Sequence, residues 1–110
     1  MKDNLFKNYY KEKYGMRTLE SSSGFICYSI KDKDCFIGEW FIRPACRGEK
    51  KGYILADAVA KRAKEAGCEH LTCTVHLAGV EPERSLAAII KYGFKITDVV
   101  GTGLYLTKEL

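Results

Sequence analysis

The stretch GEWFIRPACRGEKKGYILADAVAKRAKEAG, residues 38–67, predicts a strand, a basic turn and a helix in direct succession. Its apolar opening ends at Pro44, which cannot donate to a strand ladder and therefore ends the strand. Gly67 supplies the left-handed conformation that commonly follows a helix. Between Gly52 and Gly67 the apolar residues recur at helical spacing on one face, namely Ile54, Leu55, Ala58, Val59, Ala63 and Ala66. A strand that leads into a helix in this way is typical of α/β folds.

The turn between this strand and this helix reads RGEKKG, residues 47–52, and suits an anionic ligand. A helix amino terminus carries unpaired N–H groups and the positive end of the helix dipole. Gly48 and Gly52 let the backbone approach an anion closely, while Arg47, Lys50 and Lys51 add positive charge. A pyrophosphate fits this geometry, although an ordinary basic surface turn explains the same six residues. The pattern G-x-x-x-x-G-K-[ST] of a P-loop is absent.

The rest of the chain places this unit in a mixed sheet. Strand 35–43, the helix that follows it and strand 70–76 form a crossover unit, which should be right-handed with parallel strands. We therefore predict an α/β fold with its ligand site at the strand-to-helix turn. Elsewhere the patterns predict a helix over 4–14, a short edge strand and a loop within 16–24, a hairpin of 24–30 with 35–43, a helix from Pro82 to Gly93, and a hairpin of 94–100 with 104–110.

Composition narrows the class of protein. The 110 residues predict a single domain over residues 1–110, and 46% of them are hydrophobic, which is enough for a packed core. A net charge of +4 is weak for a dedicated nucleic-acid-binding protein. The five cysteines contain no C-x-x-C pair, so we expect free thiols in a reducing compartment, with no metal site. The charged amino terminus is no secretory signal and no apolar run spans a membrane, so we expect a soluble cytoplasmic protein.

The ordered motifs over residues 24–108 resemble those of the GNAT family of N-acetyltransferases. That family has a strand, a proline, a loop of pattern [QR]-x-x-G-x-[GA] and a helix, and later a glycine–phenylalanine pair. Here Arg47 and Gly52 match the ends of the loop pattern, Gly67 matches the end of the helix, and the pair ends LAAIIKYGF, residues 86–94. The middle glycine of the loop is Lys50. The resemblance implies an acyl-CoA N-acyltransferase fold, with helices on both faces of a mixed central sheet and a shortened amino-terminal part.

The resemblance also implies acetyl-CoA as cosubstrate and assigns residues to it. The loop would hold the pyrophosphate, and the backbone of the preceding strand would pair with the pantetheine amides in the manner of an added strand. The residues that match the cofactor-binding positions are Phe41, Ile42, Arg47, Gly48, Glu49, Lys50, Lys51, Gly52 and Tyr53.

Three residues are candidates for the proton transfers of amine acetylation. Strand alternation places Glu39 on one face with Ile37 and Phe41, an apolar setting that would make its carboxylate a better base, although an edge-strand pairing with a lysine is equally consistent. His76 ends strand 70–76 and can exchange a proton near neutral pH, or can simply be solvated. Tyr92 can donate a proton or pack. In the family a tyrosine often acts as the acid, and the position of that tyrosine is Ile89 here.

We therefore expect an N-acetyltransferase that acts on a primary amine, either a protein lysine, an amino terminus or a small amine. Its compactness resembles the minimal acetyltransferases of phages and bacteria, which implies the cytosol of a bacterium or of a phage-infected host. Ile89 favours an alternative, a non-catalytic binding module that keeps the fold, and the basic residues near the helix favour a nucleic-acid-binding protein more weakly. Phe6, Tyr9 and Tyr10 share one helical face, from which we predict a homodimer.

Overall fold

The computed structural model describes residues 5–48, 50–79 and 82–110. The elements in chain order are α1 Leu5–Tyr14, β1 Arg17–Glu20, β2 Gly24–Lys31, β3 Asp34–Ile42, a short 3₁₀ helix Pro44–Cys46, α2 Lys51–Glu65, β4 His70–His76, α3 Pro82–Tyr92, β5 Lys95–Val100 and β6 Gly103–Glu109. The order predicted from the sequence is confirmed, with end positions that differ by one or two residues. No helix within the described ranges is long and apolar enough to cross a membrane.

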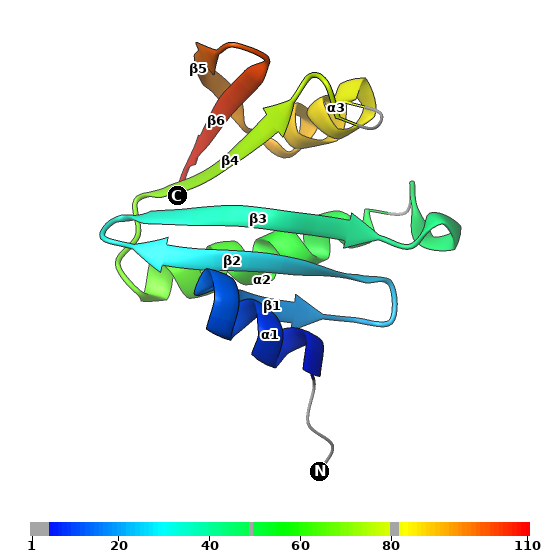
Figure 1. Ribbon diagram of the computed structural model, residues 1–110, viewed down its shortest axis with the longest axis vertical. Coiled ribbons are helices and arrows are strands. Elements are labelled where there is room, and N and C mark those ends of the chain that lie inside the picture. Colours follow the sequence, from blue (N-terminus) through cyan, green and yellow to red (C-terminus); the bar gives the residue numbers. More distant parts are fainter. Residues whose placement is uncertain (1–4, 49, 80–81) are drawn as a thin grey trace.

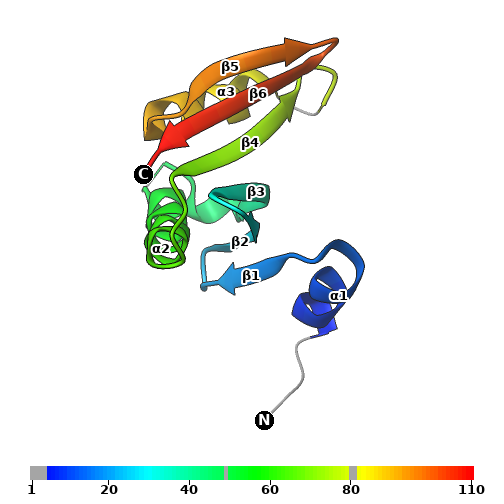
Figure 2. The ribbon, with the colours of Figure 1, turned by 90° about the vertical axis from the view of Figure 1, so that its left-hand side faces the viewer.

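The six strands form one mixed sheet in the order β1-β2-β3-β4-β6-β5. β3 and β4 are parallel neighbours, as the crossover through α2 requires, and the other neighbours are antiparallel. α1 and α2 lie on opposite sides of the β1–β3 half of the sheet (Figure 2). The expectation of an α/β fold with a mixed sheet and helices on both faces is therefore confirmed.

The core lies between α2, α3 and the face of the sheet that they cover. Leu55, Val59 and Ala63 of α2 are buried against Leu71 of β4 and Leu106 of β6. These side chains follow the helical and alternating periods of the sequence, so burial of the two apolar faces joins helix and sheet. Leu86 and Ile89 of α3 pack against the same cluster.

A β-bulge in β3 changes which side chains reach this core. Cys27 pairs with Glu39 and Tyr28 pairs with Ile37, so Gly38 has no partner residue on β2. Before the bulge Ile37 faces the core, whereas after it Trp40 and Ile42 pack against the core instead. The extra residue therefore reverses the alternation, and Glu39 turns to the face opposite Ile37.

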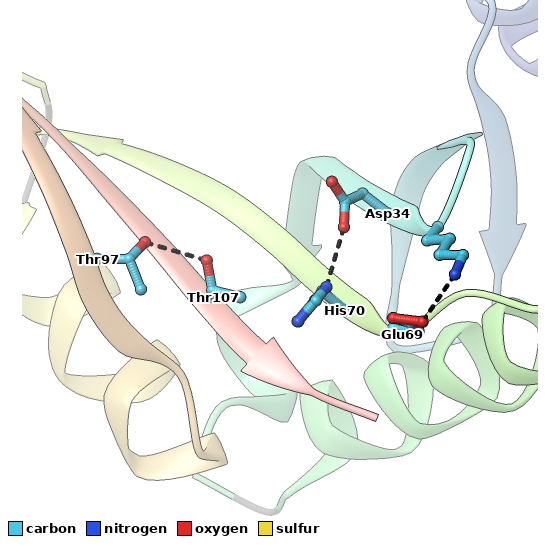
Figure 3. A network of polar contacts seen from close by, with 6 residues as sticks. Asp34, Glu69, His70, Thr97 and Thr107 are labelled. Carbon is cyan, nitrogen blue, oxygen red and sulfur yellow. Dashed lines mark hydrogen bonds and ion pairs between the residues drawn. The ribbon is translucent and has the colours of Figure 1, made fainter.

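β3 and β4 stay paired only at the start of the two strands. Their ladder runs from Asp34 opposite His70 to Ile37 opposite Cys73, and beyond it the strands diverge (Figure 1). At the closed end His70 Nδ1 lies 3.2 Å from Asp34 Oδ1, and Glu69 forms an ion pair with Lys33 (Figure 3). The sheet is therefore joined at one end of this strand pair and open at the other.

Candidate functional site

The space between the diverging strands forms a cavity of about 750 Å³. Its wall is built from the second half of β3, the loop before α2, the first turn of α2, the end of β4 and one face of α3. Ligand pockets for small molecules and cofactors commonly have volumes of about 300–1,000 Å³, so this cavity is large enough for a cofactor arm.

The loop at the mouth of the cavity has the backbone of an anion cradle. Gly48 has φ +83°, and Lys50 adopts the left-handed conformation with φ +61° directly before the first residue of α2. The Lys50 carbonyl accepts hydrogen bonds from the N–H groups of Tyr53 and Ile54, which opens the helix without a side-chain cap. The amino terminus of α2 lies at this point and carries the positive end of the helix dipole.

Gly52 brings this helix start against β3. A Cβ at Gly52 would lie 3.3 Å from both Trp40 Nε1 and Ile42 Cγ1, which is tighter than an ordinary packing contact. The Trp40 indole donates a hydrogen bond of 3.1 Å to the Gly52 carbonyl. The absence of a side chain at position 52 therefore lets the first turn of α2 sit directly beside the open half of β3.

The strand next to the loop presents the backbone carbonyl of Ile42 to the cavity. Arg43 N donates to Ser23 O at 2.8 Å, so the backbone groups of Arg43 point to β2 and those of Ile42 point away from β2. The backbone carbonyl of Phe41 also points to β2, because a Cβ on Gly24 would overlap the Phe41 carbonyl oxygen. Of the two residues expected to pair with pantetheine, Ile42 alone turns its backbone to the cavity. Phe41 contributes its side chain to the wall.

The other residues predicted to bind the cofactor fall into three groups. Arg47, Gly48, Lys50, Gly52 and Tyr53 all line the cavity. Lys51 opens α2 but lies outside the cavity wall. Glu49 lies outside the described residues.

Of the three catalytic candidates, His76 is the one that lines the cavity. It is exposed at the end of β4, where the ring borders Gly103 of β6. Its neighbour Thr74 shares the wall. Its imidazole borders the space between the diverging strands, and histidine is the side chain that most often transfers protons in enzyme sites.

Glu39 lies elsewhere, and the expectation of a dry carboxylate beside Ile37 is corrected by the bulge at Gly38. Glu39 is exposed and sits opposite Cys27 of β2, outside the cavity wall. Burial raises the pKa of the Cys27 thiol, a hydrogen bond with Thr18 opposes that rise, and the charge of Glu39 adds to it. The Glu39 carboxylate therefore lies beside Cys27, its partner on the adjacent strand β2, on the face of the sheet that α2 does not cover.

Tyr92 also lies outside the cavity wall, and its hydroxyl is bound to a residue of α2. It donates a hydrogen bond of 2.6 Å to Asp57 Oδ1 of α2, and Lys108 Nζ lies 5.6 Å from the centre of its ring. Burial, followed by the hydrogen bond and charge of Asp57, raises the pKa of Tyr92 above its usual range. The ring packs 5.3 Å from Tyr53 and 5.8 Å from Trp40, centre to centre. Tyr92 therefore joins α3 to α2 behind the cavity.

Sequence reasoning missed several side chains of the wall. Regular strand alternation predicts that Trp40 lies on the face opposite Ile37. Nothing in the sequence therefore indicated that its side chain lies in the site. On α3 the cavity meets Ser85, Ala88 and Ile89, whose spacing of three and four residues marks one helical face. Cys73 of β4 also reaches the wall, and burial raises the pKa of its thiol to about 12.

Two diverging parallel strands with a basic loop and a helix amino terminus at their open end form a site whose shape and charge suit an extended, anionic ligand. The sequence matches the Acetyltransferase (GNAT) family over residues 11–94, and the chain belongs to that family. The resemblance seen in the sequence motifs is thereby confirmed.

Several solved structures, among them acetyltransferases, have the same fold. The PaiA N-acetyltransferase of Thermoplasma acidophilum, solved in complex with coenzyme A, superimposes with a TM-score of 0.77 at 19% identity, over 96% of this chain and 69% of that one. Nourseothricin acetyltransferase gives 0.70 at 19% identity, over 86% and 65%. The anti-CRISPR protein AcrVA5 gives 0.65 at 22% identity, over 82% and 96%. The sequence has no significant match among curated proteins.

Proposed function

We propose that this protein is an acetyl-CoA-dependent N-acetyltransferase that acetylates a primary amine, with residues 1–110 as one catalytic domain. The observation that carries the proposal is the cavity between β3 and β4, which has the loop of Arg47 and Lys50 at its mouth. The PaiA relative, which was solved with coenzyme A, supports an acyl-CoA as the ligand.

The residues present fit the parts of acetyl-CoA. The loop offers guanidinium and ammonium groups beside the amino terminus of α2, which together suit a pyrophosphate. The cavity-facing backbone of Ile42 offers a strand edge, which suits the amides of a pantetheine arm. Acetyl-CoA would supply the activated acetyl thioester, so the protein needs to bind, orient and deprotonate the amine beside it.

We propose His76 as the group that removes the amine proton, because it is the catalytic candidate in the cavity wall. Glu39 would then act from the face of the sheet opposite α2, where an exposed carboxylate attracts a cationic acceptor. Tyr92 would hold α3 in position through Asp57.

A second candidate function is a non-catalytic module that binds acyl-CoA. Ile89 favours it, since this apolar side chain occupies the α3 wall at the position where the family often has a tyrosine acid. The hydroxyl groups that remain in the described wall are those of Tyr53, Thr74 and Ser85. Turnover decides between the two functions, because both bind the cofactor.

The experiment has two stages. Isothermal calorimetry with acetyl-CoA and coenzyme A tests binding, and release of free thiol in the presence of lysine peptides, amino-terminal peptides and small polyamines tests transfer. Binding with turnover supports the enzyme, whereas binding without turnover on any amine supports the module. Failure to bind either ligand would remove both.

The cellular setting and the assembly are parts of the same proposal. All five cysteines are free thiols, which supports a reducing cytoplasm as the place of action. Leu5 and Tyr9 of α1 are exposed, at 79% and 49%, which supports a homodimer that covers this helix. The side chains of Phe6 and Tyr10, also expected on that face, lie outside the described residues. Light scattering measures the mass directly, and a monomer at working concentration would contradict the dimer.

A further inference from the structure

Arg47 makes two contacts that hold it against the open half of β3. Its Nε donates a hydrogen bond of 3.0 Å to the carbonyl of Ile42. Its guanidinium carbon lies 5.8 Å from the centre of the Phe41 ring, within the range of a cation–π interaction. Phe41 is itself oriented by the Phe25 ring, whose centre lies 5.7 Å away. The guanidinium is therefore placed on the strand edge.

The Ile42 carbonyl is the group that an extended ligand needs. It faces the cavity, because the backbone of Arg43 points to β2 and successive residues alternate. A pantetheine arm that adds to this edge as a strand requires a carbonyl that can accept its amide N–H. Arg47 Nε and such an amide therefore compete for one acceptor.

Arg47 also has a second use at the same mouth. It belongs to the loop that precedes α2, beside Gly48 and Lys50, where the charge and the backbone suit a pyrophosphate. A guanidinium forms stronger hydrogen bonds to phosphate oxygens than to a neutral carbonyl, because both partners are charged. A pyrophosphate at the loop would therefore draw the side chain away from Ile42.

We propose that Arg47 is a specificity-determining residue that selects intact acyl-CoA over thioesters without a pyrophosphate, because the same side chain covers the Ile42 carbonyl until a pyrophosphate withdraws it. This inference rests on the proposed function. It adds that the two ends of the cosubstrate bind cooperatively, since occupation of the loop exposes the acceptor that the pantetheine arm needs.

The test measures pantetheine, which lacks the pyrophosphate, in the presence and absence of inorganic pyrophosphate. In the wild-type protein, saturating pyrophosphate should tighten pantetheine binding by about 2- to 10-fold, the range of one net hydrogen bond. In Arg47→Ala, pantetheine should bind about 2- to 10-fold more tightly than in the wild type without any pyrophosphate, and pyrophosphate should add nothing. Coenzyme A should bind Arg47→Ala at least about 10-fold more weakly. NMR titration covers the millimolar affinities expected for pantetheine.

Lys50→Ala is the matched control, since it removes one positive charge from the same loop and leaves the contact between Arg47 and Ile42 in place. It should weaken coenzyme A while pyrophosphate still tightens pantetheine binding. The proposal is overturned if pyrophosphate does not strengthen pantetheine binding to the wild-type protein. The same holds if the wild type does not bind pantetheine at all. Weaker pantetheine binding by Arg47→Ala overturns it too. A wild-type protein that does not bind coenzyme A would instead overturn the proposed function.

Discussion

The two halves of β3 belong to one strand but have different neighbours. Residues 34–37 pair with β4, and the side chains of Cys35 and Ile37 are almost completely buried. Residues 40–42 have left β4, and the carbonyl of Ile42 is contacted by a side chain, that of Arg47. The first half holds the sheet together, whereas the second half faces the cavity.

The difference shows how a regular sheet produces a binding site. Backbone N–H and C=O groups need partners wherever they are buried, so a strand that leaves its neighbour offers these groups to a ligand. The bulge at Gly38 lies between the two halves and changes the twist and the facing of the strand. Substitutions in the first half should therefore affect stability, and substitutions around the second half should affect binding and turnover.

The largest expected effect tests the open end, where His76 and Glu39 are compared. His76→Gln keeps a polar side chain but cannot exchange a proton near neutral pH, so turnover should fall by about 10²–10⁴-fold with little change in acetyl-CoA affinity. Glu39→Gln should lower turnover by less than about 10-fold, because Glu39 lies outside the cavity wall. Steady-state thiol release with the best amine of the wild-type protein measures both. The reverse order would instead support the sequence-based hypothesis that Glu39 is the base.

The next largest effect is expected where β3 and β4 stay paired. Leu71 of β4 is fully buried opposite Cys35, so Leu71→Ala should lower the free energy of unfolding by about 2–5 kcal/mol. Thr72→Ala, at the next position of the same strand and on the other face, should cost less than about 1 kcal/mol. Urea unfolding of both variants gives the comparison. Equal losses at the two positions would contradict the assignment of the core to one face.

The fold was largely predictable from the sequence because its signals are local. The apolar period of α2, the proline after β3 and the glycines at helix ends each act within a few residues, and together they predict the element order. The bulge at Gly38 was not predictable in this way, since it depends on the pairing of β3 with β2. That single residue reversed the expected faces of Glu39 and Trp40.

The candidate site was predictable only in the loop, where glycines and charged residues close together in the sequence form the site. The loop from Arg47 to Gly52 shows its glycines and charges in the sequence, and most of its described residues line the cavity. The role of Tyr92 depends on Asp57, which lies 35 positions earlier in the chain. A pairing over that distance leaves no local pattern, so a tyrosine that packs and one that catalyses look the same in sequence.

A smaller effect is expected where α2 meets the open half of β3. Gly52→Val would press side-chain atoms against Trp40 and Ile42, so it should cost about 1–3 kcal/mol of stability and weaken coenzyme A binding. Ala58→Val places the same side chain on an exposed position of the same helix and should cost about 0.5 kcal/mol, the difference in helix propensity. Thermal unfolding and calorimetry measure the two quantities. Unchanged coenzyme A affinity in a folded Gly52→Val protein would show that the helix start does not contact the ligand.

The smallest effect concerns the connection between α3 and α2, and it depends on pH. Tyr92→Phe removes the hydrogen bond to Asp57 and should cost about 0.5–1.5 kcal/mol near pH 8. Burial and Asp57 raise the pKa of Tyr92 in the folded protein, so the folded state retains this proton when the unfolded state has lost it. The contribution of Tyr92 is therefore fully present below its usual pKa of about 10 and is lost as the pH rises above that value.

Urea unfolding of the wild type and of Tyr92→Phe from pH 7 to pH 11 measures this loss as the difference between two curves. The gap should be constant up to about pH 10 and should close above it, because the phenylalanine of the variant has no proton to lose. Tyr105→Phe removes a hydroxyl from an exposed position of β6 and provides the control. A Tyr92→Phe gap that stays constant to pH 11 would mean that the hydroxyl is not held by Asp57. Tyr92 would then become available again as a proton donor to the cavity.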